Sequence, residues 1–132
     1  MIQTLRIVGI PKAQGRPKFF RRGNHVGTYD PKESRHWKNN VSAQIVAQKP
    51  QFIKSGAISV IMLFHLPKPK SLSKKVLRHV KKPDIDNLQK AIFDSCKGIL
   101  WGDDSQVVEI FAAKSYALEE PHVLLTVNAL VE

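Results

Sequence analysis

The sequence predicts one α+β domain, with a mixed, mainly antiparallel sheet of about four to five strands and helices packed on one side. The chain has 132 residues, which is enough for a single modest hydrophobic core. Segments in which apolar residues recur with a period of two are separated by segments with helical spacing and helix-capping residues. We therefore expect residues 1–132 to form one domain.

Four segments have the pattern of strands, and they are residues 2–9, 57–66, 106–113 and 122–131. In the first, Leu5 and Ile7 should face away from Arg6 and Val8. The second is apolar at both sets of alternate positions, so we expect it to be a central strand that is covered on both faces. Glu119-Glu120-Pro121 supplies a turn before the last strand.

Two segments have the pattern of helices. The first should have Asp30 as its N-cap and Pro31 as its first helical residue, and should end near Lys49. Its apolar residues recur every four positions and should face the sheet; they are Trp37, Val41 and Ile45.

The second helix should begin at about Asn87, because Asp86 and Gln89 have the spacing of a capping box. Gly98 is suited to end it, since glycine readily adopts the left-handed conformation found after helices. One stripe of the helix should be buried, consisting of Leu88, Ala91, Ile92, Ser95 and Ile99.

The charge is distributed unevenly along the chain. The formal net charge is +10, but residues 1–82 carry 18 Lys and Arg against two acidic residues, and residues 83–132 carry three Lys against nine acidic residues. A basic half therefore precedes an acidic half. This arrangement suits an enzyme that cleaves phosphodiesters, since cations attract the nucleic-acid backbone and carboxylates hold metal ions.

Two basic segments are candidates for DNA contact. Residues 12–29 mix cations with aromatic residues and should form a loop or irregular hairpin that grips phosphates and offers rings to unstacked bases. Residues 67–82 contain no acidic residue, and a short helix could begin at Ser73. The DNA-binding candidates are Arg16, Lys18, Arg21, Arg22, Lys81 and Lys82. The alternative for both segments is a solvated basic surface.

Three carboxylates in the acidic half could meet at one point: Asp84, Asp86 and one of the pair Asp103 and Asp104. Pro83 should make the chain enter Asp84 extended, with Asp84 and Asp86 on the same side. Clustered carboxylates repel, and Mg²⁺, or Mn²⁺, is the kind of hard ion that compensates them. The alternative is that these aspartates only cap a helix and form a turn.

The residues around this cluster resemble the RusA family of Holliday-junction resolvases. The resemblance is carried by Lys82-Pro83-Asp84-Ile85-Asp86-Asn87-Leu88, Lys90, and the run from Trp101 to Val108. It implies a RusA-like fold in which Asp84, Asp86 and Asp104 bind the metal and Lys90 is the catalytic lysine. Asp103 is an alternative or supporting ligand, and Asn87 could orient a carboxylate. Pro83 is a departure, since some members have arginine there.

The resemblance also implies a function. It is a Mg²⁺-dependent endodeoxyribonuclease that resolves four-way junction DNA by paired symmetrical nicks during DNA recombination and repair. For Lys90, an ion pair with Asp86 or Asp94 is the alternative to phosphate contact. For the whole chain, the alternatives are a non-catalytic nucleic-acid-binding module and a metal-dependent nuclease that acts on RNA.

We also expect a homodimer, because one chain has a single acidic set and two symmetry-related strands must be nicked. Candidates for its interface are Phe64, Leu66, Phe111 and the last strand. Cys96 is the single cysteine and should be buried on the second helix. Without an intrachain disulfide, and without an apolar run of the ~20 residues that span a bilayer, we expect a cytoplasmic protein with no membrane association.

Overall fold

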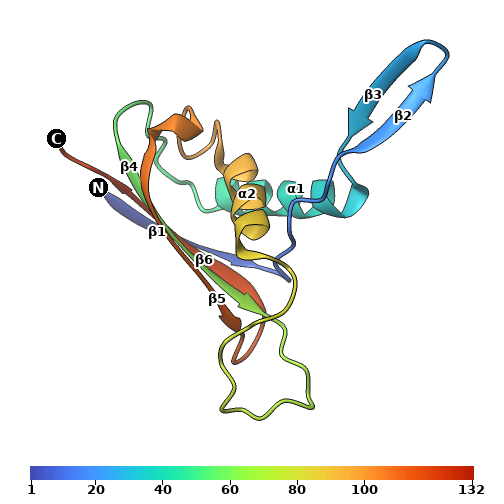
Figure 1. Ribbon diagram of the computed structural model, residues 1–132. Coiled ribbons are helices and arrows are strands. Elements are labelled where there is room, and N and C mark those ends of the chain that lie inside the picture. Colours follow the sequence, from blue (N-terminus) through green and yellow to red (C-terminus); the bar gives the residue numbers. More distant parts are fainter.

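Two helices lie on one face of a four-stranded sheet in the computed structural model, which describes residues 1–132 (Figure 1). The strands of this sheet, in spatial order, are β1 (Ile2–Val8), β6 (His122–Ala129), β4 (Ile58–Leu66) and β5 (Val107–Tyr116). The β1–β6 and β6–β4 pairs are antiparallel, and β4 and β5 are parallel. The helices are α1 (Lys32–Ala47) and α2 (Ile85–Cys96), and a short 3₁₀ helix, η1 (Asp104–Gln106), precedes β5. The predicted α+β class and mixed sheet are confirmed.

Strand β4 is central, as its sequence predicted, but only one of its faces is closed. Ile58, Val60 and Met62 are fully buried on the helix side, whereas Ile61 is 39% exposed on the other side. The expectation of cover on both faces was wrong, because both helices pack on the same side of the sheet (Figure 1). The same helix side buries Phe64 and Leu66, so these two residues are not available to a dimer interface.

Helix α1 packs as expected but is capped differently. Trp37, Val41 and Ile45 are buried. Pro31 is the N-cap, since its carbonyl accepts the backbone N–H of Arg35 at 3.1 Å, and Asp30 makes no capping bond. The carboxylate of Asp30 instead accepts the ammonium of Lys38 at 2.7 Å. Lys38, with its hydrogen bond to Asp30 as the main cause, lowers the pKa of that carboxyl group.

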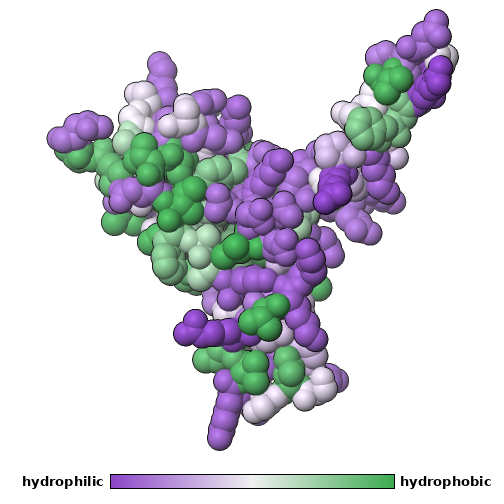
Figure 2. All heavy atoms as spheres, viewed as in Figure 1, coloured by the Kyte–Doolittle hydropathy of each residue, from purple (hydrophilic) through white to green (hydrophobic).

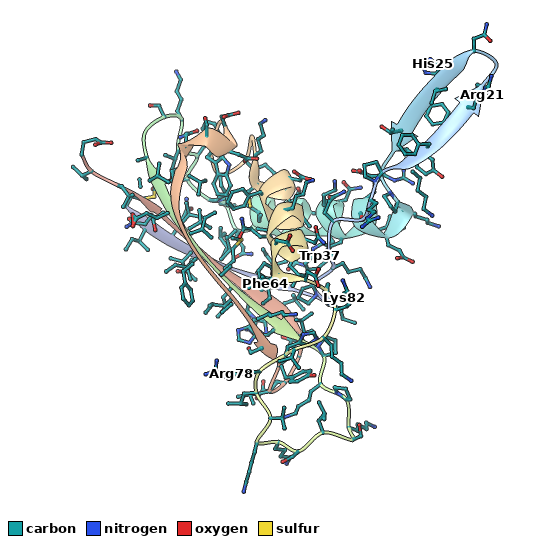
Figure 3. The ribbon with its side chains drawn as sticks, in the orientation of Figure 1. Arg21, His25, Trp37, Phe64, Arg78 and Lys82 are labelled. Atoms are coloured by element: carbon teal, nitrogen blue, oxygen red, sulfur yellow. The ribbon has the colours of Figure 1, made fainter.

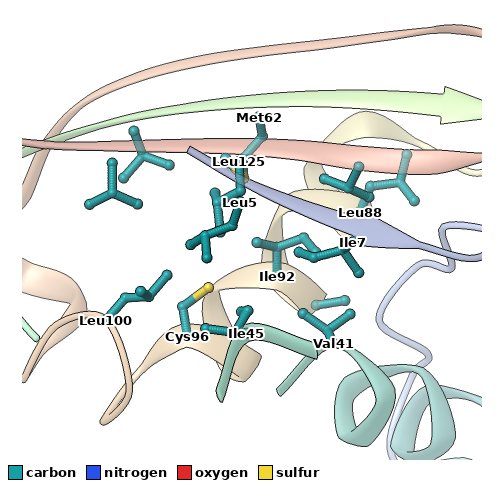
Figure 4. Packing of buried hydrophobic residues seen from close by; sticks show 14 of the residues in the cluster. Leu5, Ile7, Val41, Ile45, Met62, Leu88, Ile92, Cys96, Leu100 and Leu125 are labelled. Atoms are coloured by element: carbon teal, nitrogen blue, oxygen red, sulfur yellow. The ribbon is translucent and has the colours of Figure 1, made fainter. Parts of the chain in front are cut away.

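The core lies between the sheet and the two helices (Figure 4). Helix α2 contributes Leu88, Ile92 and Cys96, all fully buried, to a cluster with side chains of β1, β4 and β6. Leu88→Ala should lower the free energy of unfolding by about 2–5 kcal/mol, because the substitution leaves a cavity at a site without solvent access. Helix α2 ends where predicted, since Lys97 is the C-cap and Gly98 has φ of 84°.

Two segments project from the domain, one beyond α1 and the other beyond the end of β4 (Figure 1). One is an antiparallel hairpin of β2 (Lys18–Arg22) and β3 (His25–Tyr29), which we call the arm. The other is the basic segment of residues 67–82, which has turns but no helix, so the predicted helix from Ser73 is absent. Its far end returns to the sheet, where the backbone N–H of Tyr116 donates to the carbonyl of Leu77 at 2.8 Å. Neither α1 nor α2 is long and apolar enough to cross a membrane.

Candidate active site and nucleic-acid interface

Asp84 and Asp86 lie in the first turn of α2. The carbonyl of Asp84 accepts the backbone N–H of Leu88 at 3.1 Å, which makes Asp84 the N-cap and starts the helix at Ile85. The predicted capping box of Asp86 and Gln89 is therefore wrong, and Asp86 is helical rather than extended. The two carboxylates therefore do not both belong to one extended segment, as was predicted. Both are exposed at the end of the helix where the dipole favours negative charge.

Contacts from distant parts of the chain fix this end of α2. Lys114 of β5 donates to the carbonyl oxygens of Lys81 at 2.6 Å and Pro83 at 2.9 Å. The carbonyl of Asn87 accepts the backbone N–H of Gln14 at 3.0 Å. The ammonium of Lys82 lies 3.3 Å from a carboxylate oxygen of Asp84. The acidic pair is thus held between β5 and the segment that leads to the arm.

Lys90 is exposed four residues after Asp86, and residues with that spacing share a face of a helix. The alternative of an ion pair with Asp86 or Asp94 is not found. Asp94 instead lies 3.5 Å from Lys38, and no carboxylate is within ion-pair distance of Lys90. The ammonium of Lys90 therefore has no acidic partner in the chain.

Asp103 and Asp104 are adjacent but differ in their contacts. Asp103 is the N-cap of η1, and its carboxylate accepts the backbone N–H and the hydroxyl of Ser105. Gln106 completes a capping box by accepting the backbone N–H of Asp103 at 3.0 Å. The hydrogen bonds from Ser105, with a smaller effect of Lys97, lower the pKa of Asp103. Its carboxylate is therefore occupied in a turn.

Asp104 is held by a tryptophan and is partly buried. The indole N–H of Trp101 donates to its Oδ1 at 2.8 Å, and no intrachain partner binds Oδ2. Trp101 is fully buried, so it fixes this carboxylate from within the core. The sequence analysis did not assign Trp101 this positioning role, because nothing local shows which acceptor an indole N–H will meet.

The chain does not bring Asp104 to the acidic pair. Lys97, the C-cap of α2, lies 3.5 Å from the carboxylate of Asp103, and the backbone N–H of Gly98 donates to the carbonyl of Trp101 at 2.7 Å, so the adjacent Asp104 lies near the last residue of α2. Asp84 lies at the first residue, and a helix of 12 residues is about 18 Å long. Accordingly, no three carboxylate, histidine or cysteine side chains of one chain form a metal-binding group. The predicted set of Asp84, Asp86 and Asp104 is divided between the two ends of α2.

A groove lined by three lysines lies beside Pro83, the residue before Asp84. It has a volume of about 660 Å³ and lies between the segment before the arm, the start of α1 and residues 79–83. Lys12, Lys18 and Lys82 line it together with one acidic residue, Glu33, and Pro83 is also part of its lining. Lys12 belongs to the segment of residues 12–29 that was predicted to grip phosphates, although it was not one of the six candidates named singly. Its place in the groove depends on contacts such as that of Gly15, whose N–H donates to the hydroxyl of Ser34 at 2.8 Å.

His79 also lines this groove and was missed by the sequence analysis. Its Nδ1 is buried without a hydrogen-bond partner, and its ring centroid lies 4.9 Å from that of Tyr116. Burial, reinforced by Lys114, lowers the pKa of His79. No local signal distinguishes it from the exposed residues of the same segment, because its position depends on the return of that segment to β5.

The predicted DNA-binding residues occupy two places. Arg21 and Arg22 lie on the arm, whereas Lys81 and Lys82 lie beside the sheet, as Figure 3 shows for Arg21 and Lys82. Arg16 precedes the arm, and Lys18, the first residue of the arm, also lines the groove. All six side chains are exposed. Cations therefore flank the Asp84 end of α2 on two sides.

Comparison with known proteins agrees with the features of this site. Residues 9–128 match the family model described as endodeoxyribonuclease RusA. A relative from Bacillus subtilis (strain 168), the uncharacterized protein YqaN, is 35% identical over 127 residues, with 89% of each chain covered. Because the family match includes the arm, both helices, Asp84, Asp86, Asp103 and Asp104, and every strand except β1, the chain belongs to the RusA endodeoxyribonuclease family.

Proposed function

We propose that this protein is a Mg²⁺-dependent endonuclease that resolves four-way DNA junctions by paired, symmetrical nicks. One observation carries the proposal: two exposed carboxylates, Asp84 and Asp86, follow directly after Pro83, which lines a groove together with three lysines, in a chain of an endodeoxyribonuclease family. The products would be nicked duplexes, which are what DNA recombination and repair require from such a junction.

The acidic pair suits a partly hydrated metal ion. Mg²⁺ is commonly held by one or two carboxylates together with waters and substrate phosphate oxygens, and Mn²⁺ accepts similar ligands. Asp84 and Asp86 supply two carboxylates without any further residue of the chain. When bound, such an ion supplies charge at the phosphate and lowers the pKa of an attacking water.

The remaining residues of this end would position the DNA. Lys90 projects from the same helix face as Asp86 and would contact the scissile phosphate. Lys12, Lys18 and Lys82 would hold the backbone of the strand that enters the groove. The main chain of Asn87 is fixed by Gln14, which leaves its exposed amide free to orient a carboxylate.

A homodimer would explain why Asp104 lies away from the pair. The two edges of the sheet differ in cover. On β1, the amides of Gln44 and Gln48 bond the backbone of Val8 and Arg6 at 2.7 to 3.3 Å. On β5, the backbone from Val108 to Lys114 has no such partner, and Val108, Ile110 and Phe111 are 61%, 45% and 59% exposed. An uncovered apolar edge strand is suited to pair with another strand.

We infer that β5 pairs antiparallel with β5 of a second copy. Strand β5 begins just after Asp104 and ends near Lys114, which holds the segment before Asp84. A two-fold axis near Ile110 would therefore bring Asp104 of one protomer toward Asp84 of the other. Of the interface candidates from the sequence, Phe111 remains. The last strand, β6, is internal to the sheet.

The function is tested by comparing substrates. The protein should cleave a four-way junction in Mg²⁺ and not in chelator, and should leave matched duplex DNA, single-stranded DNA and RNA uncut. The nicks should lie at symmetrical positions on two opposing strands. Binding without any cleavage would identify a non-catalytic module instead, and equal cleavage of the duplex or of RNA would contradict junction specificity.

A further inference from the structure

The arm carries a hollow that shares no residue with the groove beside Asp84. It has a volume of about 480 Å³ and lies between the hairpin and α1. Its lining consists of two aromatic and three basic residues: Phe20, Tyr29, Arg21, Arg22 and Arg35. Figure 2 shows hydrophobic and hydrophilic residues intermixed on the arm, which projects beyond the end of α1.

The register of the hairpin determines which rings reach this hollow. Phe20 pairs with Gly27 and Lys18 pairs with Tyr29, so Phe20 and Tyr29 lie on the same face of the hairpin. Phe19 lies on the opposite face and is 75% exposed. The two adjacent phenylalanines of β2 therefore face different surroundings.

The ring of Phe20 is held in place by its neighbours. A Cβ added to Gly27 would lie 2.5 Å from it, so the ring needs a glycine opposite. The Tyr29 and His25 rings lie 6.3 Å and 5.9 Å from it, centroid to centroid. The guanidinium of Arg22 lies 5.9 Å from its centroid. Phe20 is thus fixed, and Tyr29, a residue that is 47% exposed, lies beside it.

The charge of the hollow is entirely positive. None of its lining residues is acidic, and none of the five ion pairs of the chain involves Arg21, Arg22 or Arg35. Asp30, which directly follows Tyr29, is occupied by Lys38 at 2.7 Å. Guanidinium groups bind phosphate in a bidentate manner and stack on flat rings. The hollow therefore suits a ligand that combines an anion with an aromatic ring.

We propose that this hollow binds one unstacked nucleotide of the DNA, with its base against Phe20 and Tyr29 and its phosphate on Arg22 and Arg35. A base inside a duplex has both faces covered by its neighbours and cannot meet a protein ring, whereas single strands present free faces. The site lies away from the acidic pair, since Figure 3 places Arg21 and His25 on the arm and Lys82 beside the sheet. The nucleotide that it holds is therefore not the one that is cleaved.

This inference rests on the proposed action on branched DNA, where unstacked bases occur, but its test needs no cleavage. Two fluorescent oligonucleotides of about ten residues are compared in chelator by anisotropy: one is oligothymidylate and the other is abasic, with the same phosphates. The wild-type protein should bind oligothymidylate on the order of tenfold more tightly. Phe20→Ala and Tyr29→Ala should remove most of this preference.

Phe19→Ala is the matched control, because it removes the same side chain from the same strand but from the other face. It should keep the preference. Since Phe20→Ala could disorder the hairpin, Arg35→Ala on α1 provides a second variant outside it. Arg35→Ala should weaken binding of both oligonucleotides severalfold without changing their ratio, and Lys32→Ala, which removes a charge from the same helix, should weaken both less.

The proposal is overturned if the wild-type protein does not prefer oligothymidylate, if Phe20→Ala keeps the preference, or if Phe19→Ala loses as much of it. It is also overturned if Arg35→Ala has no larger effect than Lys32→Ala. A protein that shows the predicted preference but cleaves no DNA would sink the proposed function and leave the nucleotide site standing. A protein that cleaves junctions but does not prefer oligothymidylate would support the proposed function and overturn the nucleotide site.

Discussion

Residues of one type that stand side by side in this sequence have different environments. Asp103 and Asp104 are consecutive, yet Asp103 accepts two hydrogen bonds from Ser105 while Asp104 accepts one from a buried indole. Only Asp104 has both a carboxylate oxygen that lacks an intrachain partner and a rigid support, which is the indole of Trp101. For this reason we propose Asp104 rather than Asp103 as the functional member of the pair, which is also the residue that the family resemblance implies.

At the residue scale we predict that Asp84→Asn, Asp86→Asn and Asp104→Asn each lower the rate of junction cleavage at least about a hundredfold, since a metal contributes several kcal/mol to the barrier. Junction binding at low salt should survive or strengthen, because each change removes a negative charge that faces phosphate. Cleavage rates and mobility-shift binding on the same junction measure both effects. Full activity of Asp104→Asn would assign the third carboxylate to Asp103.

A second residue-scale prediction concerns pH and Asp103. Its pKa is lower in the folded protein than the usual 3.8, so its bonds to Ser105 stabilise the fold above pH 3.8, and this contribution is lost as the pH falls through the lowered folded-state value. Asp103→Asn does not titrate. The difference in the free energy of unfolding between wild type and Asp103→Asn, from urea titrations, should therefore shrink as the medium is acidified below 3.8. A difference that stays constant with pH would contradict the assigned cap.

At the scale of elements, the cations are divided between the arm and the segment that precedes α2. No ion pair or backbone hydrogen bond joins these two elements, and they project from different places, one beyond α1 and one beyond the end of β4. A DNA strand in the groove between them would meet both. We therefore expect the contributions of the two elements to binding to be independent and additive.

Salt dependence tests this arrangement. The logarithm of the junction association constant should fall linearly with the logarithm of salt concentration, with a slope of about 0.9 per phosphate contact. Replacing Arg16, Arg21 and Arg22 with alanine should flatten the slope, and replacing Lys81 and Lys82 should do so separately. The matched control is replacement of Lys49 and Lys54, which lie outside both projections. If neither set of replacements changes the slope, the proposed DNA-binding surface is wrong.

At the scale of the whole molecule, the carboxylates that we propose as metal ligands lie at two separate places in one chain. Asp84 and Asp86 lie at one end of α2 and Asp104 lies at the other. The uncovered edge of β5 connects these ends, since it begins after Asp104 and ends near Lys114. Pairing of β5 with a second copy would join the two places twice, which gives the two sites that paired nicking requires.

Mixed dimers provide a direct prediction. Asp84→Asn and Asp104→Asn homodimers should both be inactive. If sites are shared, a heterodimer of the two variants has one site with both changes and one with none, so it should nick a single strand of the junction. Heterodimers refolded from a mixture and assayed for nicked and doubly cut products measure this. No nicking by the heterodimer would show that each site lies within one chain.

The same prediction depends on the β5 edge. Sedimentation of the wild-type protein should give about twice the chain mass of 14.9 kDa. Ile110→Lys places a charge on the uncovered edge and should give a monomer that supports no complementation. Ile2→Lys is the matched control on the other edge strand, where Ile2 is 68% exposed, and should remain a dimer. A monomeric wild type would contradict both the dimer and the paired nicks.

The sequence by itself determined the elements whose signals are local. Alternation of apolar residues is a property of neighbours, and it placed β1, β4, β5 and β6 within a few residues of their observed bounds. The buried stripe of α2 and the glycine that ends it were likewise predicted, because helical spacing and left-handed backbone are also local. Helix starts were misplaced by one or two residues, since several residues near Pro31 and Asp84 could have been the cap and only the first i→i+4 hydrogen bond selects one.

Tertiary structure alone decided which distant residues meet. Both helices pack on one side of the sheet, and the other face of β4 therefore stays open. This arrangement depends on the connections between elements rather than on the composition of the strand. The same holds for the support of Asp104 by Trp101, the anchoring of the Asp84 end by Lys114, and the hollow between the arm and α1. The sequence supplied the three aspartates, but their distribution over the two ends of α2 follows from the length and direction of a packed helix, which no spacing of acidic residues could show.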